Sequence, residues 1–258
     1  MTALLSTYLL LFVAAFLGGV LNSVAGGGSF LSFPALIVSG VPPINANATS
    51  TVALWPGSAA SVGAYRRELV CLNRALIIIM AMVSLLGGLL GALLLLHTPP
   101  ATFARMIPYL LLVATLLFAF GPSVTRYFRV HHAESGEHSS TTRALVAFLQ
   151  LVIALYGGFF GGGIGILMLA TLGFIGMENI HQMNALKTVL ATCINGIAVA
   201  TFVAAGAVFW PQAIVMIVGA IIGGYGGAFY ARKLDPKVVR TFVICVGVAM
   251  TVYFFIRR

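Results

Sequence analysis

Two groups of polar residues in an otherwise apolar chain have the types and spacing of a small-ligand site. The members of the second group lie three, four and seven positions apart and share one helical face: Asn184, Lys187, Thr188 and Asn195. The first group has matching positions and polar neighbours: Asn22, Ser29, Asn47 and Thr51. Two such stripes would converge near the middle of a helical bundle. Hydrogen bonding between helices without a ligand is the alternative.

Lys187 is the basic residue that falls within an apolar segment, whereas every other one fits a loop or a terminus. A lysine at the centre of a membrane helix costs about 2.5 to 3.5 kcal/mol on insertion scales, so it should face a cavity or a partner. All five acidic residues read as loop residues. Lys187 is therefore either a cation that awaits an anionic ligand or a lysine that reaches towards the membrane surface near Glu178.

Runs of three glycines, at 26–28 and 161–163, interrupt the apolar sequence at equivalent places. Glycine permits tight turns and close backbone approach, and we expect Gly27 and Gly162 to line the site. The breaks leave backbone N–H groups that must face protein, water or a ligand. The expected N-caps of the helices that follow are Ser29, Asn45 and Asn179. In the alternative interpretation the glycines only let helices pack closely, which is preferred for the runs at 87–92 and 223–228.

The composition indicates an all-α polytopic membrane protein. Of 258 residues, 60% are hydrophobic and only 7% are charged, against about 25% charged in an ordinary soluble domain. Runs such as 75–96 match the roughly 20 residues that cross a bilayer as a helix. The formal charge of +9 comes from residues in short loops between apolar segments, which favours contact with lipid rather than with nucleic acid.

Ten apolar segments follow one another along the chain. The second and seventh are too short to span a bilayer alone. Their approximate bounds are 4–24, 30–39, 46–65, 75–96, 107–124, 144–160, 164–175, 184–205, 211–230 and 241–256.

The two halves of the chain repeat each other. Asn184 follows Asn47 by 137 residues, and "FFGGGIG" parallels "VAGGGSF" at almost the same offset. We predict a first repeat at 1–124, a polar cytoplasmic linker at 125–143 and a second repeat at 144–258. If all ten segments cross, ten basic residues lie on one side and three on the other, which favours an inverted repeat with both termini outside. If the short segments turn back, the halves become parallel and the split is eight to five.

Enzymatic and metal chemistry have little support in the residues. An enzyme would need a nucleophile with an oriented base or a cluster of metal ligands. The histidines outside Lys187's segment lie in loops, and the three cysteines have no metal-type spacing. We therefore expect no catalytic residue, no metal site and no cofactor.

The whole chain resembles the TauE/SafE family of sulfite and organosulfonate exporters. The resemblance rests on "LNSVAGGGSFLSFPALIVSGVPPINANATST" and "FFGGGIGILMLATLGFIGMENIHQMNALKTV", with their glycine turns and Asn-Ala-x-x-Thr segments. It implies a permease of the inner membrane that moves a small oxyanion, often out of the cell.

The resemblance and the residues together give one expectation of function. We expect alternating-access export of a small sulfur-containing anion such as sulfite or sulfoacetate, without nucleic acid as a partner. An anion-selective channel, or an importer of another small oxyanion or carboxylate, is the alternative. The small-residue helix faces would also permit a homodimer.

Overall fold

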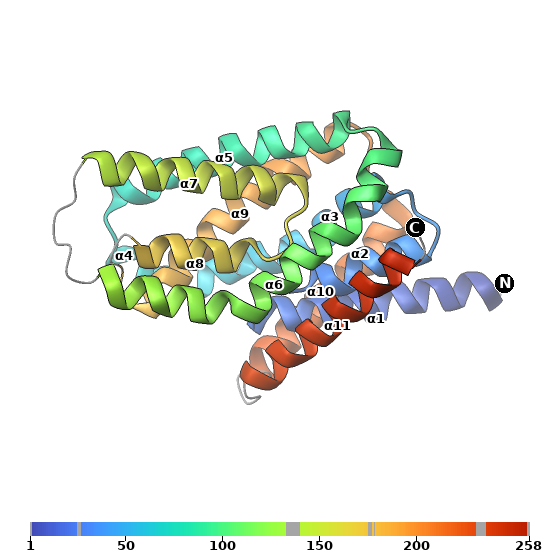
Figure 1. Cartoon of the computed structure of the whole chain (residues 1–258). Helices are drawn as coiled ribbons and strands as arrows, with labels where there is room; N and C mark the ends of the chain where they lie inside the picture. Colours follow the sequence, from blue (N-terminus) through green and yellow to red (C-terminus); the bar gives the residue numbers. More distant parts are fainter. Residues whose placement is uncertain are drawn as a thin grey trace.

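The computed structural model describes residues 2–24, 27–132, 140–174, 177, 179–230 and 236–256. Each of the ten predicted segments corresponds to a helix, and α4 is an additional short one (Figure 1). The helices are α1 (Thr2–Val24), α2 (Ser29–Val38), α3 (Pro43–Ala64), α4 (Arg66–Val70), α5 (Arg74–His97), α6 (Pro100–His132), α7 (Ser140–Phe159), α8 (Ile164–Phe174), α9 (Ile180–Ala204), α10 (Trp210–Tyr230) and α11 (Pro236–Ile256).

The outer faces of the long helices carry large apolar side chains. Leu5, Ile78 and Phe148 are 73%, 62% and 60% exposed. Exposure of such large apolar side chains is unfavourable in water but not in the hydrocarbon core of a membrane. Four helices in the described residues are long and apolar enough to cross a membrane by themselves, at 4–22, 74–97, 100–121 and 180–204. These observations confirm the predicted class, an all-α polytopic membrane protein.

Glycines bring two pairs of helices into backbone contact. α1 packs against α10, and α5 packs against α7. A Cβ atom at Gly223 would collide with the carbonyl oxygen of Phe16, and one at Gly91 with that of Leu155. In a membrane the hydrophobic effect does not drive helices together, because lipid tails are as apolar as the helices. Backbones that approach this closely are instead stabilised by dispersion contacts. The packing interpretation of the runs at 87–92 and 223–228 is confirmed at these positions.

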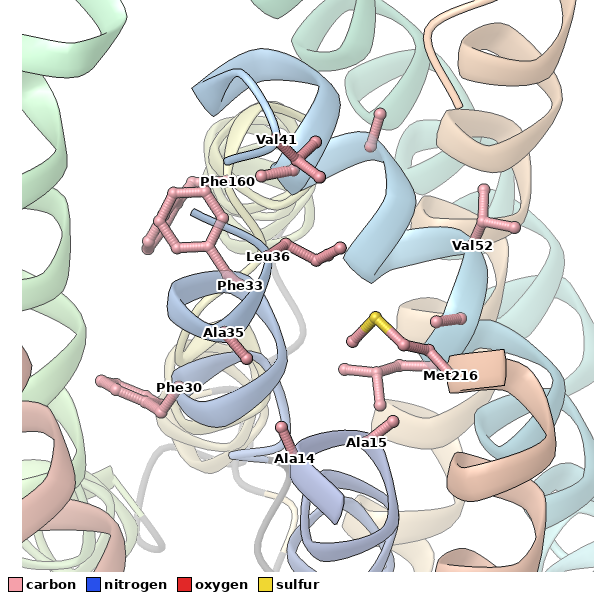
Figure 2. Close-up of a cluster of buried hydrophobic side chains, with 14 of the residues drawn as sticks. Ala14, Ala15, Phe30, Phe33, Ala35, Leu36, Val41, Val52, Phe160 and Met216 are labelled. Atoms are coloured by element: carbon pink, nitrogen blue, oxygen red, sulfur yellow. The ribbon is translucent and has the colours of Figure 1, made fainter. Parts of the chain in front are cut away.

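The short helix α2 lies inside the bundle. Six of the ten residues of α2 are buried, among them Phe30, Phe33 and Leu36. Figure 2 shows Leu36 on the side of α2 that faces Met216 of α10, Phe33 beside Phe160, and Phe30 pointing to the opposite side of the helix. The rings of Phe33 and Phe160 meet edge to face with centroids 5.7 Å apart. An apolar element of this kind can stop within the membrane because protein surrounds its ends.

The predicted linker at 125–143 is largely helical. α6 continues through His132 and α7 begins at Ser140, while residues 133–139 lie outside the described residues. The stretch "TRYFRVHH" contains neither glycine nor proline, so nothing in it stops the preceding helix. α6 therefore extends beyond the apolar segment predicted at 107–124 and into the stretch predicted as a linker.

Candidate functional site

Lys187 lies on α9 with an uncharged partner. Its Nζ donates a hydrogen bond to Asn184 Oδ1 at 3.0 Å, and its side chain is half-buried. The stem of Lys187 packs against α8, where a Cβ atom at Gly165 would lie 3.3 Å from Cδ. Glu178, the acid considered as an alternative partner, lies outside the described residues. An ammonium that is held by one neutral amide oxygen retains two N–H donors for another ligand.

A path of hydrogen bonds leads from Asn184 to α1. Thr188 Oγ1 donates to the carbonyl oxygen of Asn184 at 2.7 Å, and Thr192 Oγ1 donates to that of Thr188 at 2.8 Å. Thr192 Oγ1 also approaches the carbonyl oxygen of Ser58 on α3, at 3.4 Å. Asn22 Nδ2 on α1 donates to Ser58 Oγ at 2.9 Å. The predicted residues Asn184, Lys187 and Thr188 are thus neighbours on α9, whereas Asn22 meets Ser58 near Thr192, about two helical turns from Asn184. We call all of these residues, with Ser58 and Thr192, the lysine group.

α3 and α9 cross at Trp55, in antiparallel directions. Trp55 Nε1 donates to the carbonyl oxygen of Thr192 at 3.2 Å, and the indole packs against Gly196, where a Cβ atom would lie 3.2 Å from Nε1. The start of α3 meets the end of α9, since Asn45 Nδ2 donates to the carbonyl oxygen of Ala207 at 2.8 Å. The chain that follows α3 contacts α9 through α4.

Asn47 and Thr51 lie on the other side of this crossing. Asn47 is buried, and its Nδ2 donates to the carbonyl oxygen of Phe159, at the end of α7, at 3.1 Å. Thr51 Oγ1 donates to the carbonyl oxygen of Asn47 at 2.9 Å. With a rise of 1.5 Å per residue, Thr51 and Thr188 each lie about 6 Å from the crossing, in opposite directions. The two polar stripes therefore form two groups rather than one, because the helices that carry them are antiparallel.

The second glycine turn has left-handed backbone at two positions. Gly161 and Gly163 have φ of +82° and +80°, a conformation that residues with a Cβ atom rarely adopt. Tyr156 Oη donates to the carbonyl oxygen of Gly162 at 2.8 Å and fixes the turn. Asn195 Oδ1 lies 4.0 Å from the position of a Cβ atom at Gly161. The turn, Asn195 and Asn47 therefore lie around the end of α7, and we call this set, together with Thr51, the asparagine group.

Gly27 and Gly162 are required by space and not by φ. A Cβ atom at Gly27 would lie 3.0 Å from Val243 Cγ1, and one at Gly162 would lie 2.9 Å from Phe160 Cε1. Neither glycine has a positive φ. At the first run, Gly28 approaches α1, with a Cβ position 2.5 Å from the carbonyl oxygen of Gly18, while Gly26 lies outside the described residues.

Two of the three expected N-caps are wrong. Gly28 is the N-cap of α2, and Ser29 is its first helical residue. α3 begins at Pro43, two residues before Asn45, because the fixed φ of proline suits the first helical position. The third prediction is confirmed: Asn179 Oδ1 accepts hydrogen bonds from the backbone N–H groups of His181 and Gln182, at 2.9 and 3.4 Å.

Trp55 is the residue that the site prediction missed. It follows Thr51 by four residues and Asn47 by eight, and it precedes Ser58 by three, so the helical period already placed it on the same face. From the sequence alone, an aromatic residue at such a position is interpreted as part of the hydrophobic core. Only the contact with Thr192 and Gly196 shows that it separates the lysine group from the asparagine group.

We expect Gly163→Ala to destabilise the protein by about 1 to 2 kcal/mol, because alanine pays the full penalty of a left-handed backbone. Gly57→Ala on α3 is the matched control, since the nearest atom to its Cβ position, the carbonyl oxygen of Ala220, is 4.0 Å away and alanine favours a helix. Thermal unfolding of the two purified variants checks this. Equal melting temperatures would show that the turn tolerates a side chain.

A polytopic helical bundle with polar groups and broken helices inside is the class of protein that this geometry defines. The family model described as "Sulfite exporter TauE/SafE" matches residues 11–254. The chain therefore belongs to the TauE/SafE family.

Its curated relatives are named as membrane transporters. "Probable membrane transporter protein ORF9" of a Sinorhizobium species is 31% identical over 247 residues, which cover 94% of this chain and 90% of that protein. A "Probable membrane transporter protein" of Haemophilus influenzae is 29% identical and covers 94% and 92%. "Probable membrane transporter protein YfcA" of Escherichia coli K12 is 29% identical and covers 93% and 87%. No solved structure matches this chain.

Proposed function

We propose that this protein is an inner-membrane exporter of small sulfur-containing anions, such as sulfite or an organosulfonate, and that it works by alternating access. The observation that carries the proposal is the ammonium of Lys187, which lies within the α9 span beside a neutral amide. A charge in this position is expensive unless a partner meets it. The family description names sulfite export, and a sulfur oxyanion would supply that partner.

The lysine group supplies the donors that such an anion needs. A sulfite or sulfonate presents several oxygens, each of which accepts hydrogen bonds, and amide, hydroxyl and ammonium donors suit them. The first turn of α8 lies beside Lys187 through Gly165, and N–H groups at a helix start favour a negative charge. In this proposal Asn184, Lys187 and Thr188 bind the anion first, and Asn22, which bonds Ser58 near Thr192, lies further along its path.

The asparagine group would be the second station of the same path. It contains Asn47, Thr51, Gly162 and Asn195, and it lies beyond Trp55 from the lysine group. Ser29 and Gly27 belong to the first turn, which packs against α11. An anion that leaves the ammonium for neutral donors is held more weakly, and this favours release over retention.

The helix contacts support two inverted repeats. α1 packs on α10 and α7 packs on α5, so the opening helix of each proposed repeat contacts a helix of the other. α3 also contacts α10, and α9 contacts α5, which is the equivalent pair if α3 corresponds to α9 and α5 to α10. Trp55 and Thr192, which touch at the antiparallel crossing, are 137 residues apart, the same offset as Asn47 and Asn184. A two-fold axis through a contact between equivalent positions accounts for this, and broken helices in inverted repeats are typical of secondary transporters.

The test of the function is a binding screen on the purified protein followed by flux measurements. Sulfite, thiosulfate, sulfoacetate, taurine and sulfate, with acetate as the carboxylate control, are compared by thermal shift. An anion at 100 times its Kd should stabilise the protein by about 2.7 kcal/mol. Flux in liposomes that saturates and shows counterflow supports a carrier, whereas unsaturated electrodiffusive current indicates a channel. A shift with acetate alone would contradict a sulfur anion as substrate.

The inverted topology predicts which residues reagents reach from outside the cell. Cys71 is exposed in the loop after α4, which the charge split places in the cytoplasm, and residue 101 at the start of α6 lies on the opposite side. With Cys193 and Cys245 replaced by serine, an impermeant maleimide should label Ala101→Cys in intact cells and reach Cys71 only after permeabilisation. Labelling of Cys71 without permeabilisation would reverse the orientation.

A further inference from the structure

A proline leaves one carbonyl group of α6 without its helical donor. Residue 122 is proline and lies within α6, so it has no N–H to donate to the carbonyl oxygen of residue 118, four positions earlier. Residue 118 lies within the candidate membrane span at 100–121, which places this carbonyl inside the membrane-spanning part of α6. An unpaired backbone group costs several kcal/mol in a bilayer.

Arg240 of α11 meets that carbonyl group. Its Nε donates to the carbonyl oxygen of Phe118 at 2.9 Å, and its Nη2 donates to that of Ala119 at 2.6 Å. The guanidinium is half-buried and uses two donors of its planar fork on consecutive carbonyls. Arg240 therefore occupies the place of the amide that residue 122 lacks.

The same part of α6 contacts both glycine turns. The ring of Phe118 lies 3.2 Å from the Cβ position of Gly27 and meets Phe30 of α2 edge to face. Ala114 lies 3.2 Å from the Cβ position of Gly162. Val243, three residues after Arg240, closes on Gly27 at 3.0 Å. The position of α6 relative to α11 thus decides how both turns are packed.

We propose that Arg240 and Pro122 form a latch that holds α6 against the two glycine turns. The arginine satisfies the carbonyl that the proline exposes, and in doing so it ties α6 to α11 at Phe118 and Ala119. Release of the arginine frees the turns to move. The stabilising role of the latch requires no transported anion, so it stands or falls separately from the proposed function.

A double-mutant cycle on the purified protein tests the replacement of the amide. Arg240→Met should lower the melting temperature by several degrees, and Arg105→Met, at an exposed site on the same α6 helix, should change it little. In a Pro122→Ala background the new N–H pairs with the carbonyl of Phe118, so the effect of Arg240→Met should fall to less than half. Equal losses in both backgrounds, or no loss in either, would overturn the proposal.

Hydrogen exchange tests whether the contact between Arg240 and α6 restrains the glycine turns. Peptides that cover residues 111–121 and 159–167 should exchange at least several-fold faster in Arg240→Met than in Arg105→Met, with Pro122→Ala/Arg240→Met in between. Arg240→Lys, which keeps the charge but not the fork, serves where the methionine variant does not accumulate, and it should show the same direction of change. Unchanged exchange in these peptides in a variant that folds would overturn the latch.

Discussion

Lys187→Met is expected to weaken the binding of sulfite or an organosulfonate by about 2 to 5 kcal/mol, which is the range for the loss of a desolvated charge partner. Methionine keeps the length of the stem that packs against Gly165 and removes only the ammonium. The fold should therefore persist, and its stability should rise or stay the same, because a half-buried cation within a membrane span, whose partner among the described residues is the neutral amide of Asn184, is itself unfavourable. Titration calorimetry of the purified variant measures the change.

The controls separate charge at the site from charge in general. Arg105→Met removes one positive charge at an exposed position and should leave the affinity within about twofold, or ~0.4 kcal/mol. Lys187→Arg should also be impaired, since a planar fork replaces a compact ammonium beside Asn184. A lysine that merely reaches the membrane surface predicts near-normal affinity for Lys187→Met, and that result would remove Lys187 from the site.

Gly223→Ala should destabilise the protein by about 3 kcal/mol or more, the upper part of the range for overpacking. The added Cβ would collide with the carbonyl oxygen of Phe16 on α1. Backbone cannot rotate away as a side chain can, so α1 and α10 would have to move apart along their length. A melting temperature lower by roughly 6 °C or more is the expected reading, at about 2 to 4 °C per kcal/mol for a chain of this size.

The neighbouring glycine provides a matched control. Gly224 lies on the same helix, one residue further, and the nearest atom to its Cβ position is the carbonyl oxygen of Gly19 at 3.9 Å. Gly224→Ala should be neutral or stabilise by up to about 1 kcal/mol, because alanine is the better helix former. If the two variants unfold at the same temperature, the packing of α1 on α10 differs from that described.

The ten apolar segments that were predicted all form helices, because an apolar segment is a local property of the sequence, whereas the short polar helix α4 was not predicted. An apolar run of about 20 residues forms a helix in lipid whatever surrounds it, since its backbone groups have no other partners. The short segments were found in the same way, from the glycine runs and the proline pair that bound them. Asn179 caps α9 through bonds to residues two and three positions away, and such a contact is encoded within a few residues.

Local signals failed where a neighbouring residue outweighed them. α3 begins at Pro43, so Asn45 lies inside the helix and does not cap it. The Asn45 side chain instead donates to the carbonyl oxygen of Ala207. In the same way, helix-forming residues carried α6 into the stretch that polarity marked as a linker.

By itself, the sequence determined the class of protein, the number of apolar helices and which polar residues share a helical face, because composition and the 3.6-residue period are properties of single segments. Only the tertiary structure decided that α3 and α9 run in opposite directions and cross at Trp55, which divides the polar residues into the lysine group and the asparagine group. It also decided that Arg240 reaches the carbonyl of Phe118, 122 residues earlier in the chain. The period of a helix fixes the direction in which a side chain points, but the partner that it meets depends on how separate helices cross, and no local property of either helix contains that information.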